Sequence, residues 1–344
     1  MATSSDEGRP GMLHPAMIRP RPGTPLISVI VPVFNEEAAI LPFLAAADAG
    51  MGAAGARFEY IFINDGSRDA TLQRLLAVAA DRSDVTLVNF SRNFGKEAAM
   101  TAGLDFARGD AVVLMDVDLQ DPPDIVGAFV ARWREGFDIA YGVRESRSGD
   151  SALKRFTAGL FYGWFNRVSD TPIPPNVGDF RLLDRRVVEA LRRLPERGRF
   201  MKGLFAWVGF PAVAVSFERP ARVHGSTSWN YWRLWNFALE GLVSFSTAPL
   251  RIWSYVGGAL ALAAVLYALA ILVDALVGGV SVPGYASLIL VLLLSLALNL
   301  ISLGMIGEYV GRLFLETKQR PVYLVEGVYR NGARVSESED EGSV

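Results

Sequence analysis

Apolar runs of strand length alternate with helix-like stretches along the first half of the chain. The runs are rich in valine, isoleucine and phenylalanine and cover residues 26–34, 58–65, 85–90, 111–116 and 137–144. Helical patterns follow the first three runs, at 38–49, 71–81 and 96–109. Strands that alternate with helices indicate βαβ units, and continuous apolar runs are typical of strands buried on both faces. The pattern predicts an α/β fold built on a Rossmann-like, mostly parallel sheet.

Two uncharged apolar runs dominate the second half, at 252–273 and 287–307. Each has about the length of a membrane-spanning helix, and the absence of charge favours this interpretation over two buried helices of a soluble core. Arginine or lysine flanks the pair at Arg233, Arg251, Arg312, Lys318 and Arg320, whereas the short connection has neither. The positive-inside rule therefore predicts a C-terminal two-helix transmembrane hairpin with both termini and the N-terminal domain in the cytoplasm.

The composition and motifs limit which ligands and metal sites the chain can have. The formal net charge of -2 argues against a nucleic-acid binder. The chain has no cysteine, and its only histidines are His14 and His224, which excludes thiolate and histidine-rich metal sites. A metal here would be held by oxygen, which favours Mg²⁺ or Mn²⁺. No GxGxxG follows the first strand and no GxxxxGK[ST] occurs, so dinucleotide and P-loop sites are excluded.

Polar side chains follow the predicted strands at the edge of the sheet where ligands bind in such folds. These residues are Asn35 and Glu36, Asp65, Arg92, Asp116 and Asp118, and Arg144. The spacing places Asp116 and Asp118 on the same side of an extended segment, and Gln120 adds an amide oxygen. We expect these three to hold a divalent cation that in turn binds a diphosphate. The alternatives are a helix cap for Asn35 and a turn at Asp65.

Four ordered motifs carry a family resemblance: VPVFNEE, NDGSRDAT, RNFGKEAAMTAGLDFARGD and DVDLQDPP. Together they resemble family-two, GT-A-type inverting glycosyltransferases. Within that family the chain is similar to the polyprenyl-phosphate sugar transferases, which include bactoprenol glucosyltransferases and dolichol-phosphate mannose synthase. The similarity runs from about Ile27 to Val325 and includes GEYVGRLFLETKQRPVY after the second apolar run.

The resemblance implies roles at the matching positions. Pro32, Asn35 and Glu36 would border the nucleotide, and Asp65 would contact its base and ribose. Asp116, Asp118 and Gln120 would surround the metal. Arg222, with the segment 225–229, resembles a mobile loop over the diphosphate. The resemblance also implies a homo-oligomer, a tetramer, in the bacterial inner membrane.

Residues on the acceptor side follow the fifth strand. Asp179 in GDFRLLDRRVVEAL, interpreted as a turn joined to an amphipathic helix, resembles the acceptor-loop motif, with a turn-capping aspartate as the alternative. Arg144 and Arg155 are candidates for the acceptor phosphate. A lipid phosphate is largely dianionic at neutral pH, so we expect Asp179 to orient the acceptor more than to deprotonate it.

The predicted function is inverting transfer of one sugar from a nucleotide-diphosphate sugar to polyprenyl (undecaprenyl) phosphate. By resemblance the donor is UDP-glucose, with UDP-galacturonate, a UDP-aminosugar and GDP-mannose left open. A processive polysaccharide synthase is an alternative, but its QxxRW motif and additional spans are missing. A transporter component and an inactive nucleotide-sugar-binding scaffold are further alternatives.

The expected domains are a disordered segment at 1–24, a cytosolic catalytic domain at 25–228, juxtamembrane amphipathic helices at 229–251, two transmembrane helices at 252–308 and a cytosolic tail at 309–344.

Overall fold

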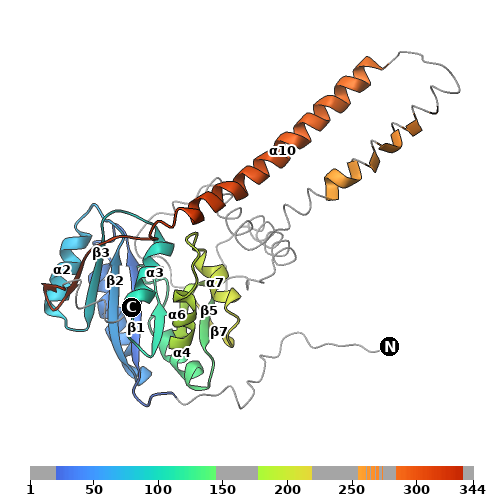
Figure 1. Ribbon diagram of the computed structural model, residues 1–344. Coiled ribbons are helices and arrows are strands. Elements are labelled where there is room, and N and C mark those ends of the chain that lie inside the picture. The colour runs from blue at the N-terminus through green and yellow to red at the C-terminus, as the bar shows by residue number, and fades with distance from the viewer. Residues whose placement is uncertain are drawn as a thin grey trace, which may run out of the picture. The chain divides into compact units, whose positions relative to one another are not determined.

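The computed structural model describes residues 21–144, 177–218, parts of 255–273, and 284–335. The chain divides into two compact units. One comprises residues 1–162, 173–229 and 321–344, and the other comprises 163–172 and 230–320. The first contains the α/β fold and the second contains the apolar helices (Figure 1).

A 9-stranded sheet, counted over the described residues, forms the centre of the first unit, with the order β7-β5-β6-β4-β1-β2-β3-β8-β9. The strands are β1 Leu26–Val33, β2 Arg57–Asn64, β3 Val85–Phe90, β4 Ala111–Leu114, β5 Ile139–Arg144, β6 Val177–Asp184, β7 Ala212–Phe217, β8 Val325–Arg330 and β9 Ala333–Arg334. β4, β1, β2 and β3 are parallel neighbours. β6 and β8 run antiparallel to β4 and β3 respectively. The prediction of an α/β fold with a mostly parallel sheet is confirmed.

Helices cover both faces of this sheet. They are α1 Ile40–Met51, α2 Thr71–Asp81, α3 Lys96–Phe106, α4 Ile125–Arg134, α6 Arg185–Arg192 and α7 Met201–Trp207, with a 3₁₀ turn, η2, at Gly52–Ala54. α1 packs against α2 and α4, whereas α3 contacts α6 as well as β1 and β2. The inner strands are buried from both sides, which is why they consist mostly of apolar residues.

Four parts of the sheet differ from the sequence prediction, and one of them is β7, which no predicted strand covers. β4 ends at Leu114, two residues before the predicted end. Residues 177–184 form the strand β6 between β4 and β5, whereas 178–191 was expected to be a turn joined to an amphipathic helix. β8, from the predicted cytosolic tail, pairs with the edge of β3, and β9 pairs with β8.

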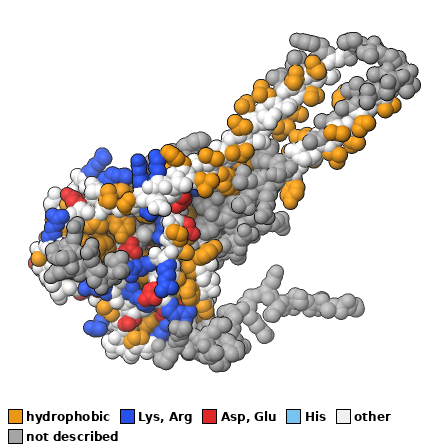
Figure 2. All heavy atoms as spheres, viewed as in Figure 1, with side chains coloured by type: hydrophobic (Ala, Val, Ile, Leu, Met, Phe, Trp, Pro, Cys, Tyr) orange, Lys and Arg blue, Asp and Glu red, His pale blue; other side chains and the backbone are white. Residues whose placement is uncertain are grey.

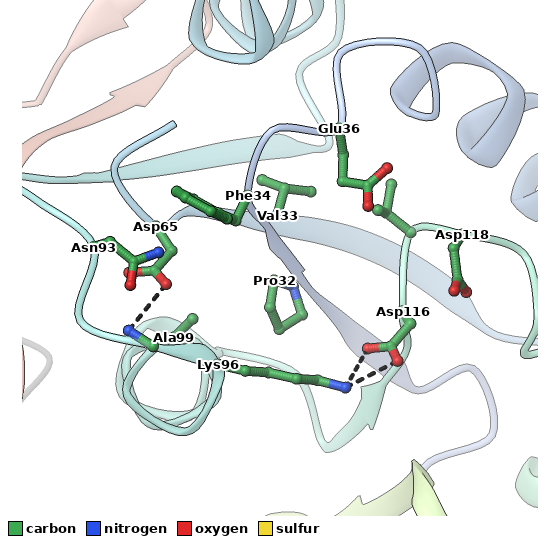
Figure 3. A pocket seen from close by; sticks show the side chains of 12 residues that line it. Pro32, Val33, Phe34, Glu36, Asp65, Asn93, Lys96, Ala99, Asp116 and Asp118 are labelled. Carbon is green, nitrogen blue, oxygen red and sulfur yellow. Dashed lines mark hydrogen bonds and ion pairs between the residues drawn. The ribbon is translucent and has the colours of Figure 1, made fainter. Parts of the chain in front are cut away.

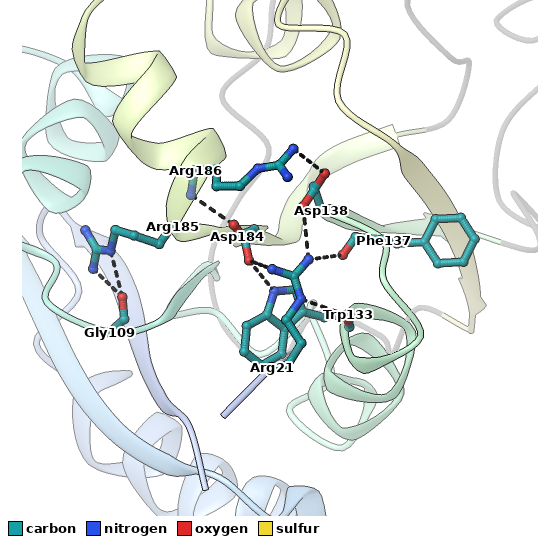
Figure 4. Close-up of polar contacts among 8 residues, drawn as sticks. All are labelled: Arg21, Gly109, Trp133, Phe137, Asp138, Asp184, Arg185 and Arg186. Atoms are coloured by element: carbon teal, nitrogen blue, oxygen red, sulfur yellow. Dashed lines mark hydrogen bonds and ion pairs between the residues drawn. The ribbon is translucent and has the colours of Figure 1, made fainter. Parts of the chain in front are cut away.

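Arg21 anchors the start of the described chain, inside the segment expected to be disordered. Its guanidinium ion-pairs with Asp138 at 3.0 Å and with Asp184, and its side chain is 9% exposed. Trp133 Nε1 donates to Asp184 at 2.7 Å, and Arg186 pairs with Asp138 at 3.0 Å (Figure 4). Buried carboxylates need such partners, so the folded unit begins before the predicted boundary at residue 25.

The second unit contains α10, Tyr285–Thr317, which includes the predicted second span and continues beyond it. Its segment Leu294–Thr317 is the one helix among the described residues that is long and apolar enough to cross a membrane. A shorter apolar helix, Tyr255–Tyr267, falls in the first predicted span. Hydrophobic side chains lie exposed along α10 (Figure 2). The predicted juxtamembrane helices at 229–251 lie outside the described residues.

Candidate active site

A cavity of about 300 Å³ lies at the carboxyl ends of β1, β2 and β4 and at the start of α3. Its lining comes from four segments: Pro32, Val33, Phe34 and Glu36; Asp65; Asn93, Gly95, Lys96 and Ala99; and Asp116, Val117 and Asp118 (Figure 3). Five residues predicted on the donor side, Pro32, Glu36, Asp65, Asp116 and Asp118, thus line a single cavity. They lie together because the carboxyl ends of parallel strands meet at the same edge of the sheet.

Asp118 reaches the cavity from a turn and not from an extended strand. The backbone leaves β4 at Leu114, and Leu119 adopts a left-handed φ of 57°. Gln120 donates from its backbone N to Asp118 Oδ1 at 3.1 Å and from Nε2 to Oδ2 at 2.7 Å. Gln120 is 5% exposed and does not line the cavity, so here it orients the Asp118 carboxylate.

Asn35 lies beside the cavity and joins two loops. Its φ of 55° is left-handed, a conformation to which asparagine is well suited. Its backbone N donates to Ser67 Oγ at 3.0 Å, and its Oδ1 accepts from Arg68 N at 2.8 Å. Asn35 therefore fixes the exit of β1 to the loop after β2, next to the residues that line the cavity.

Asp65 orders the loop that precedes α3. Its Oδ1 accepts from Phe94 N at 2.6 Å and its Oδ2 accepts from Gly95 N at 3.0 Å. Burial raises the pKa of this carboxyl above its usual range, although the two backbone donors and Arg92 oppose the shift. The next residue, Gly66, packs closely against the loop that contains Arg92. A Cβ on Gly66 would lie 2.4 Å from the backbone carbon of Arg92.

Lys96, which the sequence analysis did not select, connects the two carboxylates at the centre of the site. Its Nζ lies 2.6 Å from Asp116 Oδ1 and 2.8 Å from Asp179 Oδ2. Burial would lower the pKa of this amine, but the charges of Asp116 and Asp179 outweigh burial and raise it. Its place at the start of α3, in the quoted RNFGKEAAM motif, was the signal that could have identified it.

Asp179 lies on β6 and faces Lys96. Its Oδ1 is buried and has no hydrogen-bond partner among the described residues. Burial would raise the pKa of this carboxyl, but the charges of Lys96 and Lys202 hold it at about 2. Asp179 is therefore ionised at neutral pH. Such a carboxylate attracts and orients cations and hydroxyl groups better than it removes protons.

Arg144 ends β5 at the same edge of the sheet. Its Nε is buried without a hydrogen-bond partner in the described part of the chain. A Cβ on Gly178 would lie 3.3 Å from Arg144 Nη2, so the glycine leaves room for the guanidinium. The other predicted arginines, Arg155 and Arg222, lie outside the described residues.

Two carboxyl groups next to these residues have unusually high pKa values. Burial, and then the charge of Asp179, raise the pKa of Glu97 to about 7, although Met201 N donates to its Oε2 at 3.1 Å. Burial, and then the charge of Asp116, raise the pKa of Asp121 to about 7. Burial, together with the neighbouring carboxylates, is expected to keep these two acids partly protonated near neutral pH.

The donor atoms of the site suit an oxygen-bound divalent ion. Asp116 and Asp118 present carboxylates to the cavity, and the described residues contain no group of three acidic, histidine or cysteine side chains arranged to hold a metal ion by themselves. Mg²⁺ and similar ions commonly use one or two carboxylates and complete their shell with water and substrate phosphate. The ammonium of Lys96 already shows that Asp116 attracts a cation. The residues fit such an ion.

Comparison with known proteins places the chain in a family. Residues 28–192 match the family model described as Glycosyl transferase family 2. The chain is 48% identical to an uncharacterized glycosyltransferase of Synechocystis over 88% of its length and 95% of that protein. It is 45% identical to a prophage bactoprenol glucosyl transferase homolog of Escherichia coli, over 88% and 99% of the two chains. The chain belongs to glycosyltransferase family 2. It is therefore a glycosyltransferase, and the predicted family is confirmed.

Other relatives of this family 2 glycosyltransferase include the bactoprenol glucosyl transferase of Shigella phage SfII, with 46% identity over 88% of this chain and 98% of that one. Among solved structures, a mannosyltransferase from Pyrobaculum calidifontis, in complex with GDP-Man and Mn²⁺, is 20% identical with a TM-score of 0.45. That match covers 88% of this chain and 89% of the other.

Proposed function

We propose that this enzyme transfers one sugar from a nucleotide-diphosphate sugar to a polyprenyl phosphate with inversion at the anomeric carbon, and that the donor is UDP-glucose. The relatives named bactoprenol glucosyl transferase, which match nearly their whole length, support a polyprenyl phosphate acceptor. The observation that carries the proposal is Lys96, which joins the donor-side Asp116 and the acceptor-side Asp179 within one site.

On the donor side, Pro32, Glu36 and Asp65 border the nucleotide, and Asp116 and Asp118 hold a divalent cation, Mg²⁺ or Mn²⁺. When bound, that ion would neutralise the charge that develops on the diphosphate leaving group. Gln120 keeps the Asp118 carboxylate in position. Lys96 adds a positive charge beside the same oxygens, which lowers the cost of bringing a diphosphate next to aspartates.

On the acceptor side, Arg144 and Arg155 bind the lipid phosphate, and Asp179 orients it through Lys96. A phosphate monoester has a second pKa near 6, so it is already an adequate nucleophile at neutral pH. Its oxygen attacks the anomeric carbon from the face opposite the leaving group. The new carbon–oxygen bond forms as the bond to the diphosphate breaks, and the electron pair leaves with the nucleoside diphosphate. The low pKa of Asp179 agrees with a role other than base.

The location we propose is the bacterial inner membrane, with the catalytic domain on the cytoplasmic face. The apolar helix Leu294–Thr317 supports this, as does the need to reach a lipid phosphate in the headgroup region. The first span at 252–273, the loop residue Arg222 and the homo-oligomer stay predictions. Light scattering of the detergent-solubilised enzyme would test the oligomer.

The test is a donor panel with the purified full-length enzyme, undecaprenyl phosphate and Mg²⁺. Labelled UDP-glucose, UDP-galacturonate, UDP-N-acetylglucosamine and GDP-mannose are compared, and the lipid product is identified by mass spectrometry. We expect one glucose per lipid and no product with undecaprenol, which lacks the phosphate. Addition of many sugars to one acceptor would favour a processive synthase. Donor hydrolysis without lipid product would overturn the acceptor assignment.

A further inference from the structure

The chain that follows α10 returns to the catalytic sheet next to the donor cavity. β8 pairs antiparallel with β3, and the register shifts between Asn89 and Phe90, where β3 ends. One residue further, Ser91 N donates to Leu324 O at 3.1 Å. The ladder therefore extends beyond β3 into the loop 91–95, whose last residues, Asn93 and Gly95, line the cavity.

Aromatic rings connect this returning segment with the loop. Tyr323 stacks on Phe90 with ring centroids 5.1 Å apart and planes 12° apart. Phe90 meets Phe94 edge to face at 5.7 Å. The backbone N of Phe94 is the donor to Asp65. Tyr323 is fixed in turn, because its hydroxyl donates to Asp105 at 2.8 Å.

A chain of polar contacts leads from β8 to the exit of β1. Asn89 Nδ2 donates to Glu326 Oε2 at 2.8 Å, and Asn64 Nδ2 donates to Asn89 Oδ1 at 2.6 Å. Asn64 Oδ1 accepts from Ser67 N at 3.4 Å, and Ser67 Oγ accepts from Asn35 N at 3.0 Å. Asn64 and Asn89 are 1% and 4% exposed, so their amides depend on these partners.

We propose that Tyr323 and Glu326 are positioning residues for the donor site, acting through the loop 91–95 and the Asn64–Asn89 pair. Neither side chain lines the cavity. Tyr323 holds Phe90 and through it Phe94, whose loop supplies the backbone N–H groups that Asp65 accepts from. Glu326 holds the side-chain amides of Asn89 and, through it, Asn64, at the ends of β3 and β2. Donor affinity thus depends on residues that follow the apolar helix. The proposal rests on the proposed function in taking a nucleotide-diphosphate sugar as the ligand.

The test compares Tyr323→Leu, which removes the stacking and the hydroxyl, with Tyr323→Phe, which keeps the ring. Leu324→Ala is the matched control, because Leu324 is the next residue and is 53% exposed. Three properties are measured on the full-length enzyme: amide hydrogen exchange of residues 91–96 without substrate, the melting temperature, and the KM values for UDP-glucose and for undecaprenyl phosphate. Glu326→Ala and Glu326→Gln form a second pair.

For Tyr323→Leu we expect faster exchange over 91–96 and a donor KM raised roughly threefold to tenfold, because the ordered loop is populated less. The acceptor KM should change by less than about twofold. Tyr323→Phe and Glu326→Gln should recover most of the donor affinity, and Leu324→Ala should match the native enzyme.

Unchanged exchange at 91–96 with a lower melting temperature would overturn the proposal and leave Tyr323 with a purely structural role. Equal rises in both KM values would also overturn it. If no nucleotide sugar binds to any variant, the proposed function fails, while the exchange measurement still decides whether Tyr323 orders the loop.

Discussion

At the scale of single residues, Lys96 is the cation on which the site depends. Its Nζ contacts Asp116 and Asp179, which come from different strands. We expect Lys96→Met to lower turnover roughly a hundredfold, because positive charge near the leaving diphosphate is lost. Calorimetric titration with Mn²⁺ alone should show tighter binding, because the ammonium no longer competes for Asp116. Lys96→Arg keeps the charge. Its turnover and its Mn²⁺ affinity should therefore lie between those of the native enzyme and those of Lys96→Met. Weaker Mn²⁺ binding by Lys96→Met would contradict this competition.

Asp118 tests the metal assignment. Asp118→Asn keeps the size of the side chain but removes a charge from the site. We expect roughly a thousandfold loss of turnover with an unchanged melting temperature. EDTA should inactivate the native enzyme, and Mg²⁺ or Mn²⁺ should restore it. Asp124→Asn is the control, because Asp124 is exposed at the start of α4. Near-normal transfer by Asp118→Asn that also resists EDTA would refute the metal site.

The raised pKa of Glu97 predicts how the stability of the protein changes with pH. Its pKa rises from 4.5 in the unfolded chain to about 7 in the folded enzyme, so the folded state binds the proton more tightly. Its contribution to stability is therefore complete below pH 4.5 and is lost as the pH rises to about 7. A shift of this size corresponds to about 3 kcal/mol.

Glu97→Gln removes this titration. The melting temperature of the native enzyme should decrease from pH 5 to pH 8. The melting temperature of Glu97→Gln should decrease less over this range and should be higher than that of the native enzyme at pH 8. Scanning fluorimetry over this range measures the effect. Parallel curves for the two proteins would mean that Glu97 keeps an ordinary pKa.

At the scale of elements, the packing of α3 on β1 depends on Gly103. A Cβ there would lie 2.2 Å from Ile30 Cγ2, whereas a Cβ on Gly127 in α4 would meet nothing within 4 Å. We expect Gly103→Ala to destabilise the protein by about 1–3 kcal/mol through overpacking. Gly127→Ala should stabilise it by up to about 1 kcal/mol through helix propensity. Chemical denaturation measures the free energy of unfolding of the two variants. Equal changes in this free energy would contradict the packing argument.

The elements that could be predicted from sequence are those whose burial is uniform. β1, β2 and β3 lie between two layers of helices, so apolar runs marked them within about a residue. β6 was missed because it carries Gly178, Asp179 and Arg181, which are polar or small for reasons of the site. β8 was missed because VEGVYR has little apolar character and owes its conformation to β3.

The same limit applies within the site. The carboxyl ends of parallel strands lie at one edge of a sheet, and this rule alone predicted that Glu36, Asp65 and Asp116 lie around one cavity. The motif around Lys96 marks it as a candidate, but its salt bridge to Asp179 joins residues far apart in sequence, and the local pattern does not show that partner. Gln120 was predicted as a ligand because its spacing suits an extended strand, but the turn at Leu119 redirects it to Asp118.

At the scale of the whole molecule, the pairing of β8 with β3 restricts the topology. Hydrogen-bonded strands lie on the same side of a membrane, so any crossings of a bilayer by the chain between β7 and β8 must be even in number. If α10 is one crossing, a second must lie before it, where 252–273 is predicted to span.

Reporter fusions test this topology. A reporter after Val344 should be active only as a cytoplasmic fusion, and one inserted within 274–283 should be active only outside. A fusion before Met1 serves as the control, because the N-terminus is predicted to be cytoplasmic. An external C-terminus together with a cytoplasmic N-terminus would be incompatible with the observed sheet.

The pairing of β3 with β8 also sets the order in which the protein can be made. Asn89 and Glu326 are 237 positions apart, and the apolar α10 is synthesised between them. Until the ribosome has released residues beyond that helix, β3 is an open edge whose backbone groups can pair with another chain. Closure of the sheet therefore follows synthesis of the apolar helix α10. An excised domain that ends at residue 228 would keep this edge open permanently and should aggregate, so soluble enzyme is better sought by carrying residues 321–335 along.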